Sequence, residues 1–305
     1  MSGMDVMQKM VTTQTLMFIY MLCGIVMRRV RVINEQTRPG FVKLLTNLLL
    51  PCMILDSFNK PLDMEELKGA ALVLLVSASM CLFGYIVGKL IWRRNPLDRQ
   101  GTLLFGTMFS NAGNAGTPIV SMVFGESGVV YASFFMIPVR ILLWTMGVSL
   151  YVRGSRRDKL TKVLLNPCVV VVVLGVVLML MPFKLTGALG TAVGAIGDMT
   201  GPLAMMIIGA SLAEQKPREL LDRDAFLLSA VRLIVMPLLA LLALRMLGMD
   251  EQLLRVTVIL LAMPVAYTTA ILAERYNANY HFASKCVCLS TVLSLFTVPL
   301  ICMLL

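Results

Sequence analysis

Residues 110–118 read Ser-Asn-Ala-Gly-Asn-Ala-Gly-Thr-Pro and lie inside a segment that is otherwise apolar enough to cross a membrane. The glycines, asparagines and proline disfavour a continuous helix, so this segment exposes backbone N–H and C=O groups at the depth of the bilayer. Unpaired backbone groups are costly in lipid and are tolerated only where they are buried in protein or line a water-filled cavity. The segment therefore predicts a candidate solute site in the middle of a membrane.

The composition is typical of an integral membrane protein. Hydrophobic residues make up 58% of the 305 residues and charged residues 14%, and the mean hydropathy is +0.84. Because a membrane-spanning helix needs about 20 apolar residues, we expect ten spans, at residues 10–27, 40–58, 69–92, 102–124, 129–152, 164–181, 187–212, 226–247, 253–273 and 282–304. The predicted fold class is an all-α integral membrane protein with ten transmembrane helices.

The positive charges alternate between the two sides of these spans. The connections after the odd-numbered spans, with the span ends beside them, carry 19 Lys and Arg residues, and the opposite side carries six. Cytoplasmic loops are enriched in Lys and Arg, so we expect both termini to face outward from the cytoplasmic membrane. This topology explains the net charge of +10 without nucleic-acid binding. The first span is followed by Arg28 and Arg29 rather than a cleavage site, which indicates that it is retained.

Four prolines in the middle of spans indicate an internal repeat. Pro51 and Pro118 are 67 residues apart, and Pro202 and Pro264 are 62 apart. We therefore expect two five-helix repeats, residues 1–158 and 159–305, in each of which the second and fourth spans are broken. An odd number of spans inverts the second repeat, and paired broken helices in inverted repeats are typical of secondary transporters. The alternative is that each proline only kinks its helix.

The breaks predict a site for an anion. Thr117 and Pro118 look like the start of a half-helix, with a hydroxyl cap and a proline in the first turn. Pro264 predicts a similar start in the ninth span, followed by Tyr267 and Thr268. If the two spans cross, two positive helix ends meet, and they favour a carboxylate or a similar anion. The amides of Asn111 and Asn114 would bind the same ligand.

Charged residues at membrane depth are costly and usually face a cavity or a partner. Arg140, near the centre of the fifth span, is predicted to bind the anion, with an ion pair to Asp198 as the alternative. Asp198 is also the candidate for proton coupling. Arg232 lies near the basic side and is expected to extend to the lipid headgroups. Asp56, near the outer end of its span, is expected to be solvated.

Several other classes of function are disfavoured. The seven cysteines lie in or beside spans and the single histidine is His281, so neither a disulfide framework nor a metal site is indicated. No phosphate-binding loop of an ATP-driven pump is present. A membrane enzyme would need an acid and a base within reach at depth, where only Asp198 qualifies. We expect no cofactor, and a sensor or scaffold that does not transport stays open.

Four motifs occur in order along the chain: Ser110-Asn111 followed by Gly116-Thr117-Pro118 and Phe124-Gly125-Glu126, then Leu165-Asn166-Pro167, Gly201-Pro202-Leu203 with Gly209-Ala210-Ser211-Leu212, and Ala262-Met263-Pro264. Together they resemble the auxin efflux carrier family of bacterial and plant transporters, which includes the plant PIN-FORMED carriers. The resemblance covers essentially the whole chain. It implies ten spans in inverted repeats, crossing broken fourth and ninth spans, and export or exchange of organic acids. It also implies an elevator, in which spans one, two, six and seven form the scaffold and the others move.

The chain departs from this family in three places. It lacks the long central loop of the plant carriers, it has residues 112–115 as Ala-Gly-Asn-Ala where bulkier apolar residues are usual, and Arg140 replaces Asn or an apolar residue. The last difference favours a strongly anionic ligand. The coupling ion stays open between a proton and sodium, as used by the related bile-acid sodium symporters. The assembly stays open between a monomer and a homodimer in the lipid bilayer.

Overall fold

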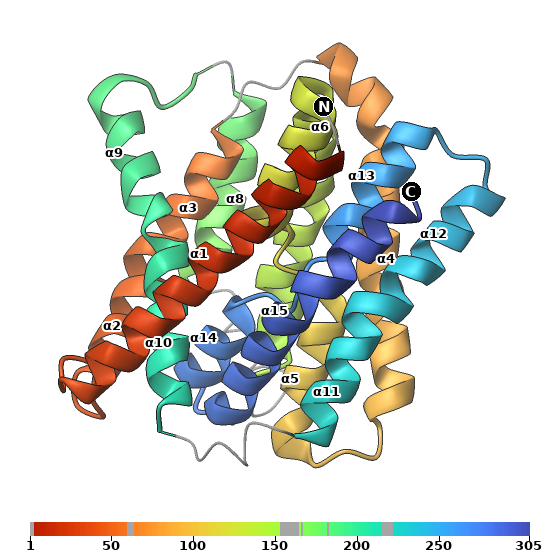
Figure 1. Cartoon of the computed structure of the whole chain (residues 1–305). Helices are drawn as coiled ribbons and strands as arrows, with labels where there is room; N and C mark the ends of the chain where they lie inside the picture. Colours follow the sequence, from red (N-terminus) through yellow and green to blue (C-terminus); the bar gives the residue numbers. More distant parts are fainter. Residues whose placement is uncertain (1–2, 60–63, 153–164, 166, 182, 215–221) are drawn as a thin grey trace.

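The computed structural model describes residues 3–59, 64–152, 165, 167–181, 183–214 and 222–305, and within them every regular element is a helix (Figure 1). The all-α prediction is confirmed for this part of the chain. Six helices are long and apolar enough to cross a membrane, namely Arg38–Asp56, Ala71–Trp92, Val130–Gly147, Gly187–Leu212, Arg223–Met246 and Tyr280–Met303. The arrangement of ten spans as inverted repeats stays a prediction.

One group of helices is built from the segments predicted as spans one, two, six and seven. Its elements are α1 (Gly3–Arg29), α2 (Arg38–Leu44), η1 (Leu45–Leu49), α3 (Leu50–Phe58), α8 (Pro167–Leu180), α9 (Gly187–Asp198) and α10 (Thr200–Leu212). Helix α1 packs along α10, and α3 packs against both α8 and α9. Helices from the first half of the chain therefore pack directly against helices from the second half in this group.

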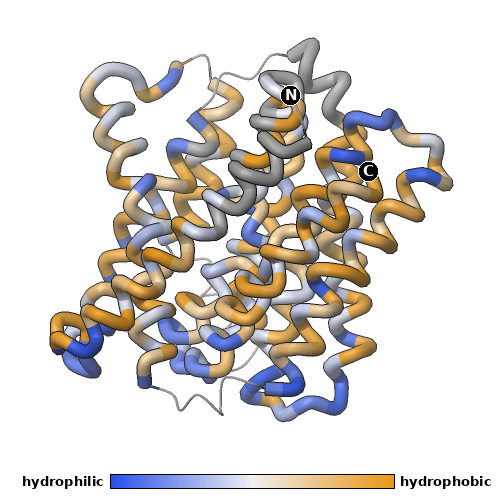
Figure 2. Tube along the Cα trace, viewed as in Figure 1, coloured by the Kyte–Doolittle hydropathy of each residue, from blue (hydrophilic) through white to orange (hydrophobic). Residues whose placement is uncertain are grey.

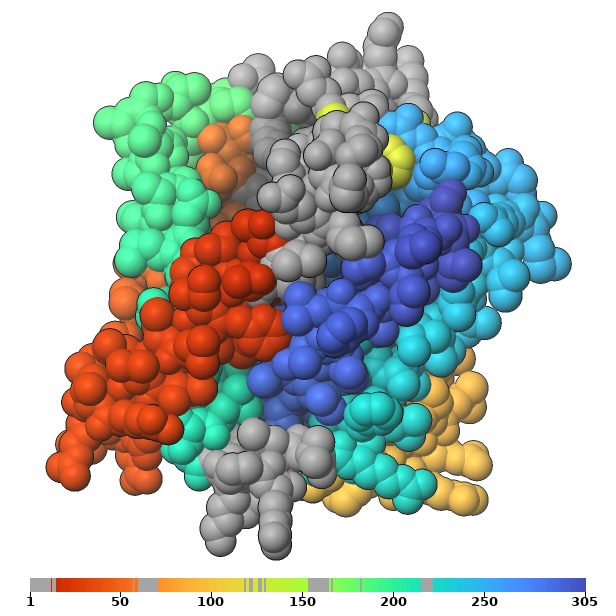
Figure 3. Space-filling view, in the orientation of Figure 1, coloured from red at the N-terminus to blue at the C-terminus, as the bar shows by residue number. Residues whose placement is uncertain are grey.

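A second group contains the remaining helices. Its elements are α4 (Met64–Trp92), α5 (Leu97–Met108), η2 (Ala112–Gly116), α6 (Thr117–Leu142), η3 (Leu143–Gly147), α11 (Arg223–Ala230), η5 (Val231–Val235), α12 (Met236–Met246), α13 (Glu251–Leu261), α14 (Thr268–Arg275) and α15 (Tyr280–Met303). Helix α4 packs against α5 and α6, and α15 packs against α11 and α14. The two groups meet where α1 lies beside α15, as Figure 3 shows.

Prolines in this bundle follow π-helical turns rather than breaking every helix. Pro51, Pro118 and Pro237 each stand two residues after the end of a π-helical segment. Proline cannot donate the usual backbone hydrogen bond, and a wider turn before it relieves the loss. The second span therefore runs through Pro51 without a break, and the prediction that it is broken is wrong. The seventh span is divided at Met199 into α9 and α10, three residues before Pro202.

Hydrophilic residues gather towards the two ends of the bundle, and hydrophobic residues predominate between them (Figure 2). Helices α1 and α4 end at the lower end in Figure 1, where α5 and α11 begin, and both chain termini lie at the opposite end. Large apolar side chains are exposed along the sides, for example Leu75, Val173 and Phe296. Such a surface is suited to contact with lipid tails.

Candidate solute site at the crossing of two broken helices

The fourth and ninth predicted spans are both interrupted, and their interruptions contact each other. The backbone N–H of Asn111 donates to the carbonyl of Pro264 at 2.8 Å, and that of Ala266 donates to the carbonyl of Phe109 at 3.3 Å. These bonds form an isolated antiparallel bridge between Ser110 and Val265. Backbone N–H and C=O groups that have no partner within one broken helix are therefore hydrogen-bonded to the backbone of the other, as burial in a membrane requires.

Side chains fix this crossing further. The Ser110 hydroxyl donates to the carbonyl of Leu260 at 2.7 Å, and the Val265 N–H donates to the Ser290 hydroxyl at 3.1 Å. Gly116 lies against the other broken helix, because a Cβ atom at this position would be 2.8 Å from Leu260 Cδ2. A larger residue at position 116 would force the side chains of Leu260 and Met263 to shift.

The half-helices begin at different residues from those predicted. The first starts at Ala112 in η2 and continues into α6, so Thr117 and Pro118 lie inside it rather than at its start. The Thr117 hydroxyl donates to the carbonyl of Ala112 at 3.3 Å and does not cap the helix. The second starts at Thr268, four residues after Pro264. Both prolines therefore mark a break, but neither is the first residue of a helix.

Three predicted site residues come together near these helix starts. The Tyr267 hydroxyl donates to Met53 Sδ at 3.4 Å and also interacts with the Asn114 amide. The charge of Arg140 acts on Tyr267 and on Asp56. Asn114, Tyr267 and Arg140 thus form a polar cluster between the two groups of helices.

Two further observations complete the surroundings of this cluster. The Asn114 amide reaches α10, because its Nδ2 atom lies 2.9 Å from the point where a Cβ atom on Gly201 would stand. The hydroxyl of Thr268, at the start of α14, is buried and has no hydrogen-bond partner among the described residues. An unpaired buried hydroxyl is costly, which favours a ligand or water as its partner.

Two other predicted residues lie elsewhere. The Asn111 side chain is buried and donates to Met17 Sδ in α1 at 3.7 Å, and no hydrogen bond or ion pair among the described residues joins it to the cluster. Asp198 is exposed at the end of α9, and within the described ranges no ion pair joins it to Arg140. The acidic group that interacts with Arg140 is Asp56, which is partly exposed, and its contact with solvent stays a prediction.

Arg232 does not extend to the headgroups, and that prediction is wrong. Its side chain is 0% exposed. Its Nη1 atom donates to the carbonyl of Thr107 at 2.9 Å and its Nη2 atom to the carbonyl of Leu261 at 2.8 Å. The position of Arg232 near one end of its span suggested that its side chain could reach the lipid headgroups. The sequence gives no sign that the ends of two distant helices supply carbonyl groups that accept its hydrogen bonds at this depth.

An ion-pair network at the lower end of the bundle was also not predicted. Arg38 contacts Glu214 at 2.8 Å and Glu274 at 2.7 Å, and its guanidinium lies 4.3 Å from the centre of the Tyr280 ring. Arg28 also contacts Glu214, at 3.1 Å. Burial raises the pKa of Glu274, while the charge of Arg38 opposes that shift. The network ties α1, α2 and the end of α10 to α14 and α15.

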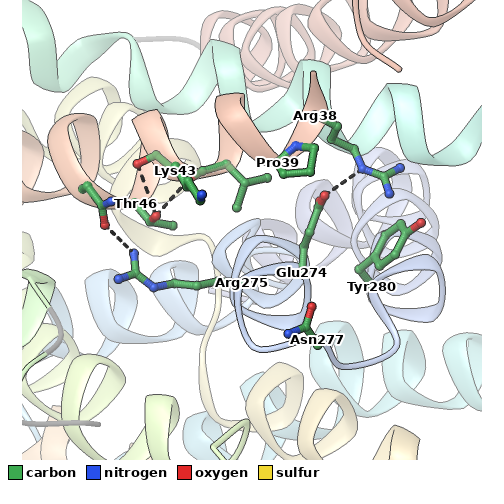
Figure 4. Close-up of a pocket in the computed structure, with 10 residues that line it drawn as sticks. Arg38, Pro39, Lys43, Thr46, Glu274, Arg275, Asn277 and Tyr280 are labelled. Atoms are coloured by element: carbon green, nitrogen blue, oxygen red, sulfur yellow. Dashed lines mark hydrogen bonds and ion pairs between the residues drawn. The ribbon is translucent and has the colours of Figure 1, made fainter. Parts of the chain in front are cut away.

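A cavity of about 670 Å³ opens beside this network (Figure 4). Arg38, Pro39, Lys43 and Thr46 form one wall, and Glu274, Arg275 and Tyr280 form the other. Arg275 reaches across and donates to the Asn47 side chain at 3.0 Å. The cavity therefore lies between the two groups of helices at the end of the bundle that carries most of the basic residues.

Comparison with known proteins identifies the family of this chain. The family model described as membrane transport protein matches residues 6–162 and 151–302. An uncharacterized transporter of Methanothermobacter thermautotrophicus is 27% identical over 95% of this chain and 97% of its own. An uncharacterized transporter of Methanocaldococcus jannaschii is 23% identical over 93% of this chain and 95% of its own. The predicted resemblance is confirmed, and the chain belongs to the membrane transport protein family of the auxin efflux carriers.

Proposed function

We propose that this protein is a secondary active transporter that exports or exchanges small organic acid anions across the cytoplasmic membrane. The observation that carries the proposal is the backbone pairing of residues 109–111 with residues 264–266, which joins two broken helices inside the bundle. Broken helices of this kind form substrate sites in secondary transporters, where helix N-termini point at anionic groups. The family membership supports transport as the activity.

The anion would bind where the half-helices begin. The positive dipole ends at Ala112 and Thr268, where the two half-helices begin, would attract a carboxylate. Asn114, Tyr267 and Thr268 would donate hydrogen bonds, and Arg140 would neutralise the charge of the ligand. Asn111, Thr117, Pro118 and Pro264 would contribute through the backbone of the crossing. Asp198 is exposed, so proton coupling through it would have to occur outside this cluster.

The transport step would be an elevator movement. The helices of predicted spans one, two, six and seven pack together, and the helices of the other spans pack with each other. The second group would carry the site past the first. Both termini would face outward, because the basic residues at the ends of α1 and α4 and at the starts of α5 and α11 lie at the other end of the described part of the molecule.

Uptake into proteoliposomes tests this function. The purified chain is reconstituted and given labelled mono- and dicarboxylates, with a proton gradient, a sodium gradient or an excess of unlabelled acid inside. We expect accumulation of at least one carboxylate, inhibited by related acids. Accumulation only with sodium would support the alternative, a carrier of the bile-acid symporter type. Absence of uptake for the whole panel, from protein that stays folded, would favour a sensor or scaffold.

The ion pairs of Arg38 should hold the two groups of helices together at the lower end of the bundle in Figure 1. The reporter is a Thr46→Cys substitution in a variant from which the native cysteines have been removed. In this background we expect Arg38→Gln to raise the rate at which the introduced cysteine is labelled by about tenfold or more. The reason is that hydrogen bonds to charged groups each contribute about 1.5–3 kcal/mol, and about 1.4 kcal/mol corresponds to a tenfold change in an equilibrium. Thr46 is 2% exposed and lines the cavity. The measurement uses a membrane-impermeant thiol reagent on inside-out vesicles.

Arg29→Gln is the matched control, because Arg29 is exposed near the same end of α1. Its labelling rate should equal that of the parent. If Arg38→Gln also labels at the parental rate, the network does not hold the two groups of helices together.

A further inference from the structure

Arg232 lies between the ends of two helices that come from opposite halves of the chain. Thr107, whose carbonyl accepts from Nη1, is in the last turn of α5, and Leu261, whose carbonyl accepts from Nη2, is the last residue of α13. These are the first halves of the two broken spans, and both end at the crossing. One guanidinium therefore binds the C-terminal ends of both half-helices.

The charges at this point are balanced. The C-terminal end of a helix carries about −0.5 elementary charge, so two such ends compensate about one positive charge. Arg232 is fully buried, and among the described residues no carboxylate forms an ion pair or a hydrogen bond with it. A buried charge without compensation is strongly unfavourable. The two helix ends, with their otherwise unpaired carbonyl groups, supply that compensation.

We propose that Arg232 is the resident cation of the crossing, and that it occupies the place where a coupling cation would otherwise bind. In carriers with broken helices, unwound carbonyls and the C-terminal ends of half-helices hold sodium ions or protons. Here the carbonyls of Thr107 and Leu261 are already engaged by a fixed side chain. The position between these helix ends therefore needs no sodium ion while Arg232 occupies it.

This inference deepens the proposed carrier function and rests on it only for its statement about coupling. Arg232 does not touch the polar cluster of Asn114, Tyr267 and Arg140 in the described contacts, so it acts as a positioning residue. By joining α5 to α13 it fixes how the two half-helices that follow, η2 with α6 and α14, are placed relative to each other. A neutral residue of similar size would leave two negative helix ends facing each other.

Chemical rescue tests the proposal. We expect Arg232→Ala to lower the apparent melting temperature in detergent by about 10 °C, as for loss of one partner of a buried pair in a chain of this size. The variant leaves room for a free cation between the helix ends. Guanidinium chloride at about 20 mM, where its denaturing action is small, should restore at least half of that loss and should leave the parent protein unchanged.

Arg245→Ala is the matched control, because Arg245 also donates to a backbone carbonyl, that of Leu304, but is exposed. We expect no rescue by guanidinium there. Arg232→Lys and Arg232→Met separate charge from volume, and Arg232→Lys should keep most of the parental stability and uptake while Arg232→Met loses both. Equal behaviour of the Lys and Met variants, or an Arg232→Ala protein that guanidinium does not stabilise, would overturn the proposal.

The thermal measurements need no substrate, so they stand even if the protein fails to transport carboxylates. Conversely, normal uptake of carboxylates by Arg232→Met would leave the proposed function intact and would refute the role of Arg232. The two inferences can therefore fail separately.

Discussion

Asn114→Leu is expected to reduce carboxylate uptake by at least about a hundredfold, because hydrogen bonds to a charged group are each worth about 1.5–3 kcal/mol and a buried polar group left unpaired adds to the loss. Asn114 interacts with Tyr267, and its amide lies close to Gly201 in the other group of helices. Leucine occupies a similar volume, so we expect little change in the amount of folded protein. Initial rates of uptake, normalised to reconstituted protein, measure the effect.

Asn111→Leu is the matched control for the same change in a neighbouring amide. The Asn111 side chain donates to the sulfur of Met17, whereas its backbone forms the crossing. We expect a clearly smaller loss of uptake than for Asn114→Leu. The opposite order, with Asn114→Leu active and Asn111→Leu inactive, would move the ligand site to the side of α1.

The position of the crossing could be predicted from the sequence because it depends on local chemistry. Residues 110–118 combine polar and helix-breaking residues within an apolar segment, and Pro264 repeats the signal in the second half. The first half-helix starts six residues before the predicted first residue, Pro118, and the second starts four residues after Pro264. A proline is tolerated inside a helix when a π-helical turn precedes it, and hydrophobic periodicity carries little information about such a turn. The π-helical segment η1 likewise precedes Pro51, and the helix continues through that proline.

The partners of the buried charges could not be predicted in the same way. Arg232 binds carbonyls that are 125 and 29 residues away, and Arg38 binds Glu274 at a separation of 236 residues. Backbone carbonyls are present at every residue, so only the packing of the helices selects those that serve as acceptors. The depth of a charge in its span is therefore a weak guide to whether it reaches lipid headgroups or a helix end. Asn114, Tyr267 and Arg140 were found because their residue types are unusual at membrane depth.

Arg140→Gln is expected to weaken transport of dicarboxylates about tenfold more than transport of monocarboxylates. Arg140 belongs to the polar cluster, and within the described ranges it forms no ion pair or hydrogen bond, so its charge is available to a ligand. A charge-assisted bond to a second carboxylate is worth about 1.5–3 kcal/mol, and each 1.4 kcal/mol corresponds to about a tenfold change in affinity. Concentration dependence of uptake for matched mono- and dicarboxylates gives the ratio.

The alternative role of Arg140 is to balance Asp56, whose charge acts on it. In that case Arg140→Gln would leave the partly exposed Asp56 carboxylate without its compensating charge and would lower the free energy of unfolding, by less than the ~3–5 kcal/mol that breaking a fully buried pair costs. The double variant Arg140→Gln/Asp56→Asn would then regain stability, whereas Asp198→Asn, at an exposed position, would have no effect on either property. We expect the melting temperature of Arg140→Gln to stay close to that of the parent. Normal dicarboxylate affinity in this variant, with a stability loss that Asp56→Asn restores, would assign Arg140 to the fold and leave the anion to the helix starts, Asn114 and Tyr267.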